Sequence, residues 1–351
     1  MSFQAQADFN RLDPDHGTLS FGGIEPSTFL EPDADVRAEL CVRLTPRYAD
    51  STRDVRVRYS LNGAAAAPVV VVQGGISAGR DVVATAGGGP GWWSGIAGPG
   101  RALDTRRCRV LSIDWLELAD LGDAPAVDSA DQADAIAAVL DALGVRRIRA
   151  YVGSSYGAMV GLAFAARHPQ RLDHLVAIAG AHRAHPLSVA LRNIQREIVR
   201  LGARLGDADA GLDLARRLAM TTYRGEREFA ERCADAPVLE GGRFRFAEEE
   251  WLKAAGSSFV RRFDGARYLA LSESIDLHRV EPEAVQVPTT LIGISTDRVV
   301  PLSDLCDLQR RCGAAASLHV IDSRYGHDAF LKEETQISAL LSEAFASIGA
   351  A

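Results

Sequence analysis

Short runs of uniformly apolar residues recur along the chain and alternate with longer stretches that have helical spacing. Several runs are too apolar to leave one face in water, which is typical of parallel strands covered on both sides. We expect one helix over residues 131–143, with Ser129 as its N-cap, and another over 156–167. The strand-length runs cover residues 69–72, 110–113, 148–152, 175–179, 290–294 and 318–321. This alternation predicts an α/β protein with a mostly parallel sheet.

The alternation is interrupted once, between residues 183 and 282. This stretch is rich in Arg, Glu, Ala and Leu at helical spacing and has few strand-like runs. We therefore predict one α/β core, formed by residues 1–182 and 283–351, with residues 183–282 inserted as a helical lid above the strand ends. The first 50 residues are expected to contribute edge strands and a hairpin.

The charge and cysteine content of the chain indicate which kinds of partner and which cellular compartment to expect. The 351 residues include 39 basic and 46 acidic side chains, a net charge of -7, and neither sign forms a long block. We therefore expect no nucleic acid and no membrane among the partners. Five cysteines without a Cys-x-x-Cys pair favour a reducing compartment and no metal site. Since the chain has no signal-like N-terminus and no apolar segment of about 18 residues, we predict a soluble, cytoplasmic protein.

The segment Gly153-Ser154-Ser155-Tyr156-Gly157 carries the first chemical signal. It follows an apolar strand directly and opens the helix expected over 156–167, which is the context that a Gly-x-Ser-x-Gly nucleophile elbow requires. The two glycines allow a sharp turn without a Cβ clash. Ser155 is therefore the candidate nucleophile.

A serine hydroxyl is a weak nucleophile at neutral pH and needs a base that is itself oriented by an acid. Asp297 follows the strand expected over 290–294, and His327 follows the strand over 318–321. Both lie at carboxyl ends of strands, where open α/β sheets bind their ligands. We predict Ser155, His327 and Asp297 as a catalytic triad. The backbone N–H of Tyr156 and that of Ile76, in the loop after the strand over 69–72, are the expected oxyanion donors.

Several further motifs together resemble the homoserine O-acyltransferases of methionine biosynthesis, from about residue 50 to the C-terminus. They are Gly-Trp-Trp-Ser-Gly at 91–95, Gly-Pro-Gly at 98–100, the elbow, Arg-Arg-Leu at 216–218, Thr-Tyr-Arg at 222–224, Arg-Phe-Asp at 262–264 and Gly-His-Asp-Ala-Phe-Leu at 326–331. The resemblance implies an α/β-hydrolase fold and the same triad. It also implies that Arg216, Tyr223 and Asp328 hold an amino-acid substrate, and that the protein is a homodimer. Acyl-CoA is the implied co-substrate, without a bound cofactor.

Two departures from the family pattern border the expected pocket and leave the substrates open. Ser154 and Tyr156 stand where the family usually has Gly and Met, and the segment 113–131 is short and lacks a usual Gly-Ser-Thr-Gly-Pro stretch. We favour L-homoserine as acceptor over L-serine, and acetyl over succinyl as the acyl group. Arg80 and Arg324 are considered as partners for a succinyl carboxylate. An esterase or thioesterase with the same triad, or a catalytically silent binding protein, is the alternative.

Overall fold

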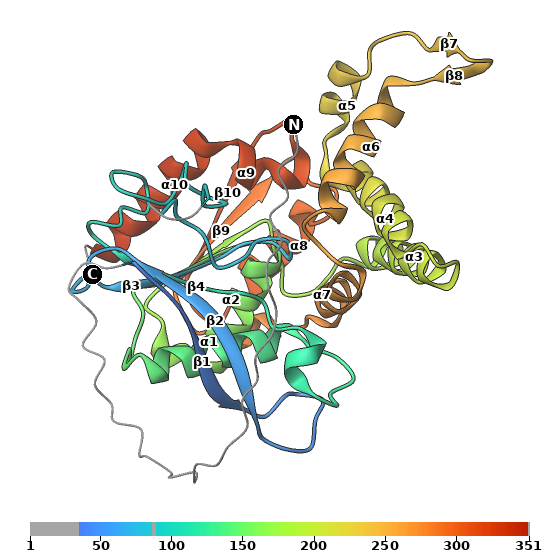
Figure 1. The fold of residues 1–351 in the computed structure, drawn as a ribbon. Coiled ribbons are helices and arrows are strands. Elements are labelled where there is room, and N and C mark those ends of the chain that lie inside the picture. Colours follow the sequence, from blue (N-terminus) through green and yellow to red (C-terminus); the bar gives the residue numbers. More distant parts are fainter. Residues whose placement is uncertain (1–34, 86–88, 350–351) are drawn as a thin grey trace, which may run out of the picture. The chain divides into compact units, whose positions relative to one another are not determined.

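The central sheet is built mainly from parallel strands. The computed structural model describes residues 35–85 and 89–349. In these residues the main sheet has eight strands in the order β1-β2-β4-β3-β5-β6-β9-β10 (Figure 1). They are β1 (Val36–Leu44), β2 (Arg53–Asn62), β3 (Val69–Gln73), β4 (Arg109–Ile113), β5 (Ala150–Ser154), β6 (Leu175–Ile178), β9 (Thr289–Ile294) and β10 (Ala316–Ile321). From β4 to β10 neighbours are parallel, and β1 and β2 are antiparallel at one edge. The predicted α/β class is confirmed.

The inner parallel strands are buried on both faces because each face is covered, whereas the edge strand β10 is partly exposed. Val71 belongs to a core with residues of α1 (Ser129–Ala142) and α2 (Tyr156–Arg167). Its neighbours Val70 and Val72 belong to a second core with residues of α10 (Glu334–Gly349). Successive side chains of a strand point to opposite faces, so one uninterrupted apolar run contributes residues to both cores.

Two local expectations need correction. Asp128, not Ser129, caps α1: its carboxylate accepts from the N–H groups of Ala130 and Asp131 at 2.8 and 3.1 Å. A carboxylate also complements the positive end of the helix dipole, and the Ser129 hydroxyl is bonded elsewhere. The strand expected over 148–152 is displaced, since β5 spans Ala150–Ser154 and Ile148 forms only an isolated bridge. Expectations for residues 1–34 lie outside the described residues. An edge hairpin does form, but only its first strand β1 lies within the first 50 residues, since its partner β2 begins at Arg53.

The inserted segment is mainly helical. It contains α3 (Pro186–Arg204), α4 (Ala208–Tyr223), α5 (Glu226–Arg232), α6 (Ala247–Val260), α7 (Gly265–Leu277) and a hairpin of β7 (Val238–Glu240) and β8 (Arg243–Arg245). Figure 1 shows α3, α4 and α6 side by side, with the hairpin extending beyond them. The remaining elements are α8 (Leu302–Arg311), α9 (Ala329–Lys332), η1 (Leu118–Leu121), η2 (Pro169–Arg171), η3 (Pro282–Ala284) and η4 (Gly326–Asp328). No helix in the described part is long and apolar enough to span a membrane.

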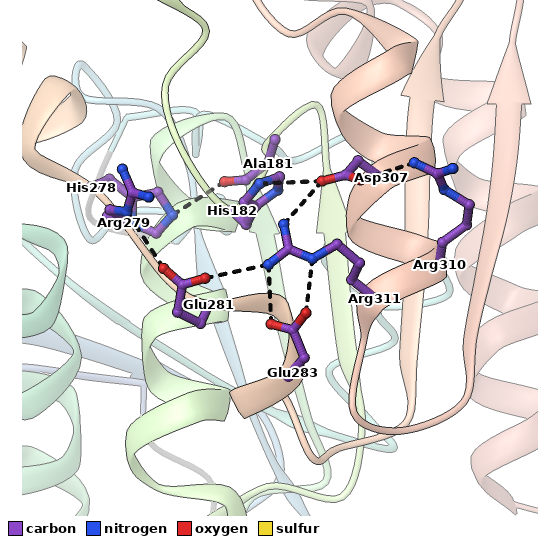
Figure 2. Close-up of polar contacts among 9 residues, drawn as sticks. All are labelled: Ala181, His182, His278, Arg279, Glu281, Glu283, Asp307, Arg310 and Arg311. Carbon is purple, nitrogen blue, oxygen red and sulfur yellow. Dashed lines mark hydrogen bonds and ion pairs between the residues drawn. The ribbon is translucent and has the colours of Figure 1, made fainter.

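The two ends of the insertion are joined to each other and to the core. The N–H of Val280 donates to the carbonyl of His182 at 2.9 Å, next to an antiparallel bridge between Arg183 and Arg279. The His278 ring contacts the carbonyl of Ala181 at 3.1 Å (Figure 2). The insertion therefore leaves and re-enters the core at one place.

Candidate active site

Ser155 occupies a sharp turn between β5 and α2. Its backbone has φ 54° and ψ -118°, a left-handed conformation that side-chain-bearing residues rarely adopt. The flanking glycines are required by close packing. A Cβ on Gly153 would lie 2.2 Å from the carbonyl oxygen of Gly157, and a Cβ on Gly157 would lie 2.2 Å from that of Gln73. The turn therefore presents the Ser155 side chain at the end of the strand.

The three residues predicted as a triad lie in one hydrogen-bonded chain. Ser155 Oγ is 2.8 Å from His327 Nε2, and His327 Nδ1 is 2.7 Å from Asp297 Oδ2. The other carboxylate oxygen of Asp297 accepts from the N–H groups of Val299 and Val300 at 2.7 and 3.0 Å. These two backbone donors, which the sequence did not reveal, hold the carboxylate toward the imidazole. This geometry suits proton transfer from a serine hydroxyl to an oriented histidine.

The electrostatic surroundings of His327 favour its protonated form. Burial is the largest influence and acts to lower the pKa of the imidazole. The charge and hydrogen bond of Asp297, together with the charge of Asp328, act in the opposite direction, and Arg192 adds a smaller lowering. The net result is a His327 pKa above its ordinary value of 6.5. The imidazolium formed during proton transfer is thereby stabilised.

The predicted oxyanion donors lie at the start of α2 and in the loop after β3. Within the described residues, neither the N–H of Tyr156 nor that of Ile76 donates a hydrogen bond. The loop is held close to the nucleophile, since a Cβ on Gly75 would lie 3.9 Å from that of Ser155. The indole N–H of Trp115 donates to the Gly75 carbonyl at 3.0 Å and restrains this backbone.

Comparison with known proteins assigns this chain to a family. Residues 68–334 match the model of the alpha/beta hydrolase fold. A homoserine O-succinyltransferase of Xanthomonas campestris is 51% identical over 92% of this chain and 88% of its own length. A homoserine O-acetyltransferase of Moorella thermoacetica is 34% identical over 72% of this chain and 78% of its own. The chain belongs to the homoserine O-acyltransferase family.

Solved structures support the fold of this acyltransferase. A homoserine O-acetyltransferase from Bacillus anthracis superposes with a TM-score of 0.80 at 18% identity, covering 89% of this chain and 97% of the other. Esterase E22 superposes with a TM-score of 0.79 at 18% identity, covering 89% and 100%. At such identities the likeness concerns the fold, which transferases and esterases share.

The residues predicted to hold an amino acid lie around the triad, but not all in one pocket. Tyr223, at the end of α4, lines the pocket that contains Ser155, and its ring is tilted by 46° to the His327 ring at a centroid distance of 5.5 Å. Arg216 lies behind it, with its guanidinium carbon 5.3 Å from the Tyr223 ring and 4.7 Å from the Phe259 ring. Among the described residues, Arg216 has no carboxylate partner. Asp328 is buried and has Arg224 Nε 3.0 Å from its Oδ2.

The two arginines considered for a succinyl carboxylate are engaged elsewhere. Arg80 donates to the carbonyl of Ala38 at 3.2 Å and lies 3.8 Å from Asp114. Arg324 pairs with Glu231 and donates to the Tyr325 hydroxyl at 3.0 Å. Neither lines the pocket that contains Ser155. The sequence pattern missed a different arginine, Arg192 of α3, which does line it.

The pocket contains histidine and acidic side chains, which are the residue types that bind metals. His185 and Asp304 line it together with His327. Within the described residues, no cluster of three or more His, Cys, Asp or Glu is arranged to hold a metal ion. The chemistry that this arrangement supports is nucleophilic acyl transfer through a serine.

Proposed function

We propose that this protein transfers an acyl group from an acyl-CoA to the side-chain hydroxyl of L-homoserine, as a step of methionine biosynthesis. The chain of contacts from Ser155 through His327 to Asp297 is the observation that carries the proposal. It supplies the activated nucleophile that acyl transfer needs. The relative that is 51% identical, a homoserine O-succinyltransferase, supports the choice of acceptor.

The proposed mechanism has two half-reactions. In the first, Ser155 Oγ attacks the thioester carbonyl while His327 accepts its proton, and the N–H groups of Tyr156 and Ile76 stabilise the oxyanion. The carbon–sulfur bond then breaks, and CoA leaves as the thiol with the proton from His327. In the second, His327 deprotonates the homoserine hydroxyl, which attacks the acyl-Ser155 ester. The proton returns to Ser155 as the product forms, so no bound cofactor is needed.

For the acyl group we propose succinyl rather than the acetyl expected from the sequence motifs. The succinyltransferase relative matches this chain at 51%, whereas the acetyltransferase of Moorella thermoacetica matches at 34%. Acetyl transfer is the alternative. The experiment below tests the two donors against each other.

Arg216, Tyr223 and Asp328 are proposed to hold the acceptor. Homoserine is a zwitterion, so its carboxylate needs a cation and its ammonium needs an anion. Arg216 supplies a guanidinium that is stacked on two rings without a carboxylate partner among the described residues. Asp328 supplies the carboxylate, which Arg224 holds in place. L-serine, which is one methylene shorter, is the competing acceptor.

The insertion over residues 183–282 is proposed to act as a lid that keeps water from the acyl-enzyme. His185, Arg192, Tyr223 and Ile275 come from this segment and line the pocket beside Ser155. Exclusion of water distinguishes a transferase from an esterase with the same triad. We also propose a homodimer with no nucleic-acid or membrane partner.

One experiment tests the proposed reaction, its acyl donor and its acceptor. Release of free thiol is measured from succinyl-CoA and acetyl-CoA, each with homoserine, with serine or without acceptor. We expect sustained release only with homoserine, a higher kcat/KM for succinyl-CoA, and an acyl adduct on Ser155 by peptide mass spectrometry. The Ser155→Ala variant should form no adduct. Sustained release without acceptor would identify a thioesterase, and failure of both donors to acylate Ser155 would refute the proposed function.

A further inference from the structure

Arg192 is a buried arginine of α3 beside the candidate nucleophile. It is 7% exposed and lines the pocket that also contains Ser155 and His327. Its Nε donates to Asp276 Oδ1 at 2.6 Å. Its Nη2 is buried and has no hydrogen-bond partner within the described residues. Because buried guanidinium donors are nearly always satisfied, this group is suited to a ligand with acceptor oxygens.

The charges around Arg192 do not balance. Arg196, one turn further along α3, donates to Asp276 Oδ2 at 2.6 Å and to Ser272 O at 3.1 Å. Two buried guanidinium groups therefore share the single carboxylate of Asp276, which leaves an excess positive charge beside the pocket. Two further charged residues line the pocket, Asp304 of α8 and the exposed Arg183. Their charges are opposite in sign to each other. A buried excess charge is costly without a counter-ion, so the cluster favours an anionic ligand.

We propose that Arg192 binds the distal carboxylate of the succinyl group and sets the preference for a succinyl donor. This inference rests on the proposed function, in which Ser155 carries the acyl chain. Arg192 and Ser155 line the same pocket, so in this proposal the distal carboxylate of a succinyl group on Ser155 Oγ is the partner of Arg192 Nη2. An acetyl group carries no carboxylate and would leave Arg192 Nη2 without a partner among the described residues.

The alternative ligand for Arg192 is the carboxylate of the acceptor. The reaction brings one carboxylate with the donor and one with homoserine, and Arg192 and Arg216 are the two arginines considered for them. Arg216 is outside the lining of the Ser155 pocket and stacks on Tyr223 and Phe259. We assign Arg216 to the acceptor and Arg192 to the donor because, of these two, Arg192 lines the pocket with the nucleophile.

Asp276 is a positioning residue in this arrangement. Its two oxygens hold Arg192 and Arg196 separately, at 2.6 Å each. Binding of Nε by Asp276 fixes the plane of the Arg192 guanidinium and leaves Nη2 for a ligand. A rigid fork of this kind suits a carboxylate better than a flexible ammonium does.

The test compares the two donors in Arg192→Leu and Arg192→Lys. The rate of Ser155 acylation is measured with succinyl-CoA and with acetyl-CoA in the same enzyme preparation, and the KM for homoserine is measured separately. The ratio of the two kcat/KM values is independent of the fraction of folded enzyme. In Arg192→Leu we expect the kcat/KM for succinyl-CoA, divided by that for acetyl-CoA, to fall roughly 10- to 150-fold. This is the effect of losing a charged hydrogen bond. Arg192→Lys should recover part of it.

Arg200→Leu is the matched control, since Arg200 lies on the same helix and pairs with Glu197 at the surface. Its donor ratio should equal that of the wild type. An unchanged ratio in Arg192→Leu, with or without a higher KM for homoserine, would overturn the assignment and leave the proposed function intact. Wild-type acylation from acetyl-CoA alone would also overturn it, whereas no acylation from either donor would refute the proposed function itself.

Discussion

His327 is the single residue whose protonation should control the rate. The proposed base must be neutral, and Asp297 and Asp328 raise its pKa above 6.5 despite burial. We therefore expect kcat/KM to fall as the pH drops, with a midpoint above 6.5. Asp297→Asn should lower the rate roughly 10³- to 10⁴-fold, because it favours the wrong imidazole tautomer, and should move the midpoint to lower pH. Rate profiles from pH 5 to 9 test this, and a midpoint below 6.5 in the wild type would contradict it.

Arg216 and Arg217 are adjacent arginines with different expected roles. Arg217 pairs with Asp213 one turn earlier in α4, whereas Arg216 stacks on the Tyr223 and Phe259 rings. Arg216→Ala should raise the KM for homoserine roughly 30-fold or more, since the acceptor carboxylate loses a charged partner. The acylation half-reaction contains no amino acid and should change much less. Arg217→Ala serves as the control, and an equal effect of both substitutions on KM would exclude the assignment.

Among the structural elements, the base of the insertion depends on a neutral histidine. His278, at the end of α7, has Nδ1 2.7 Å from the Ser129 hydroxyl. Its Nε2 lies 3.1 Å from the Ala181 carbonyl, a contact drawn in Figure 2. Burial lowers its pKa to about 3. These contacts tie the insertion to α1 and to the loop after β6.

This histidine should make stability depend on pH. The unfolded chain protonates His278 near its ordinary pKa of 6.5 and the folded protein only near about 3. The stabilisation is therefore complete above 6.5 and decreases as the pH falls below it, by up to about 1.4 kcal/mol per pH unit. Urea unfolding of wild type and His278→Asn at pH 7 and pH 5 measures the difference. A His278→Asn variant that loses as much stability on acidification as the wild type would contradict this role.

The whole molecule presents an apolar stripe on α3 that has no partner in the described residues. Leu187, Ile194, Leu201 and Leu205 of this helix region are exposed by 58, 52, 48 and 76%. The first three recur every seven residues, which places them on one face of the helix. We therefore expect this face to lie in the proposed homodimer interface.

Light scattering after size exclusion tests the dimer. The wild type should have about twice the 37.6 kDa mass of one chain. The double variant Ile194→Asp and Leu201→Asp should be monomeric, because two buried carboxylates would face apolar surface. Leu239→Asp, on the exposed hairpin strand β7, is the control and should stay dimeric. A wild-type monomer, or a double variant that still dimerises, would exclude this interface.

Local sequence was sufficient for the features that depend on neighbouring residues. The elbow was readable because two glycines and a strand–helix junction are encoded within a few positions, and α2 begins and ends where expected. Uniformly apolar runs predicted parallel strands covered on both faces, since a strand with one solvent-exposed face alternates between apolar and polar residues. Asp297 and His327 were found because carboxyl ends of parallel strands meet at one edge. The strand order in the sheet had no comparable local signal.

Only the tertiary structure decided which residues of distant segments meet. The α1 cap depended on contacts with Arg47 and His278, which lie 81 and 149 residues from Asp128 and Ser129. Arg192 resembles any polar residue of an amphipathic helix until α7 places Asp276 against it. The partner of Asp328 was equally hidden. Hydrophobic periodicity reports whether a position faces the core, but a buried charge is defined by its counter-charge, and that comes from another part of the chain.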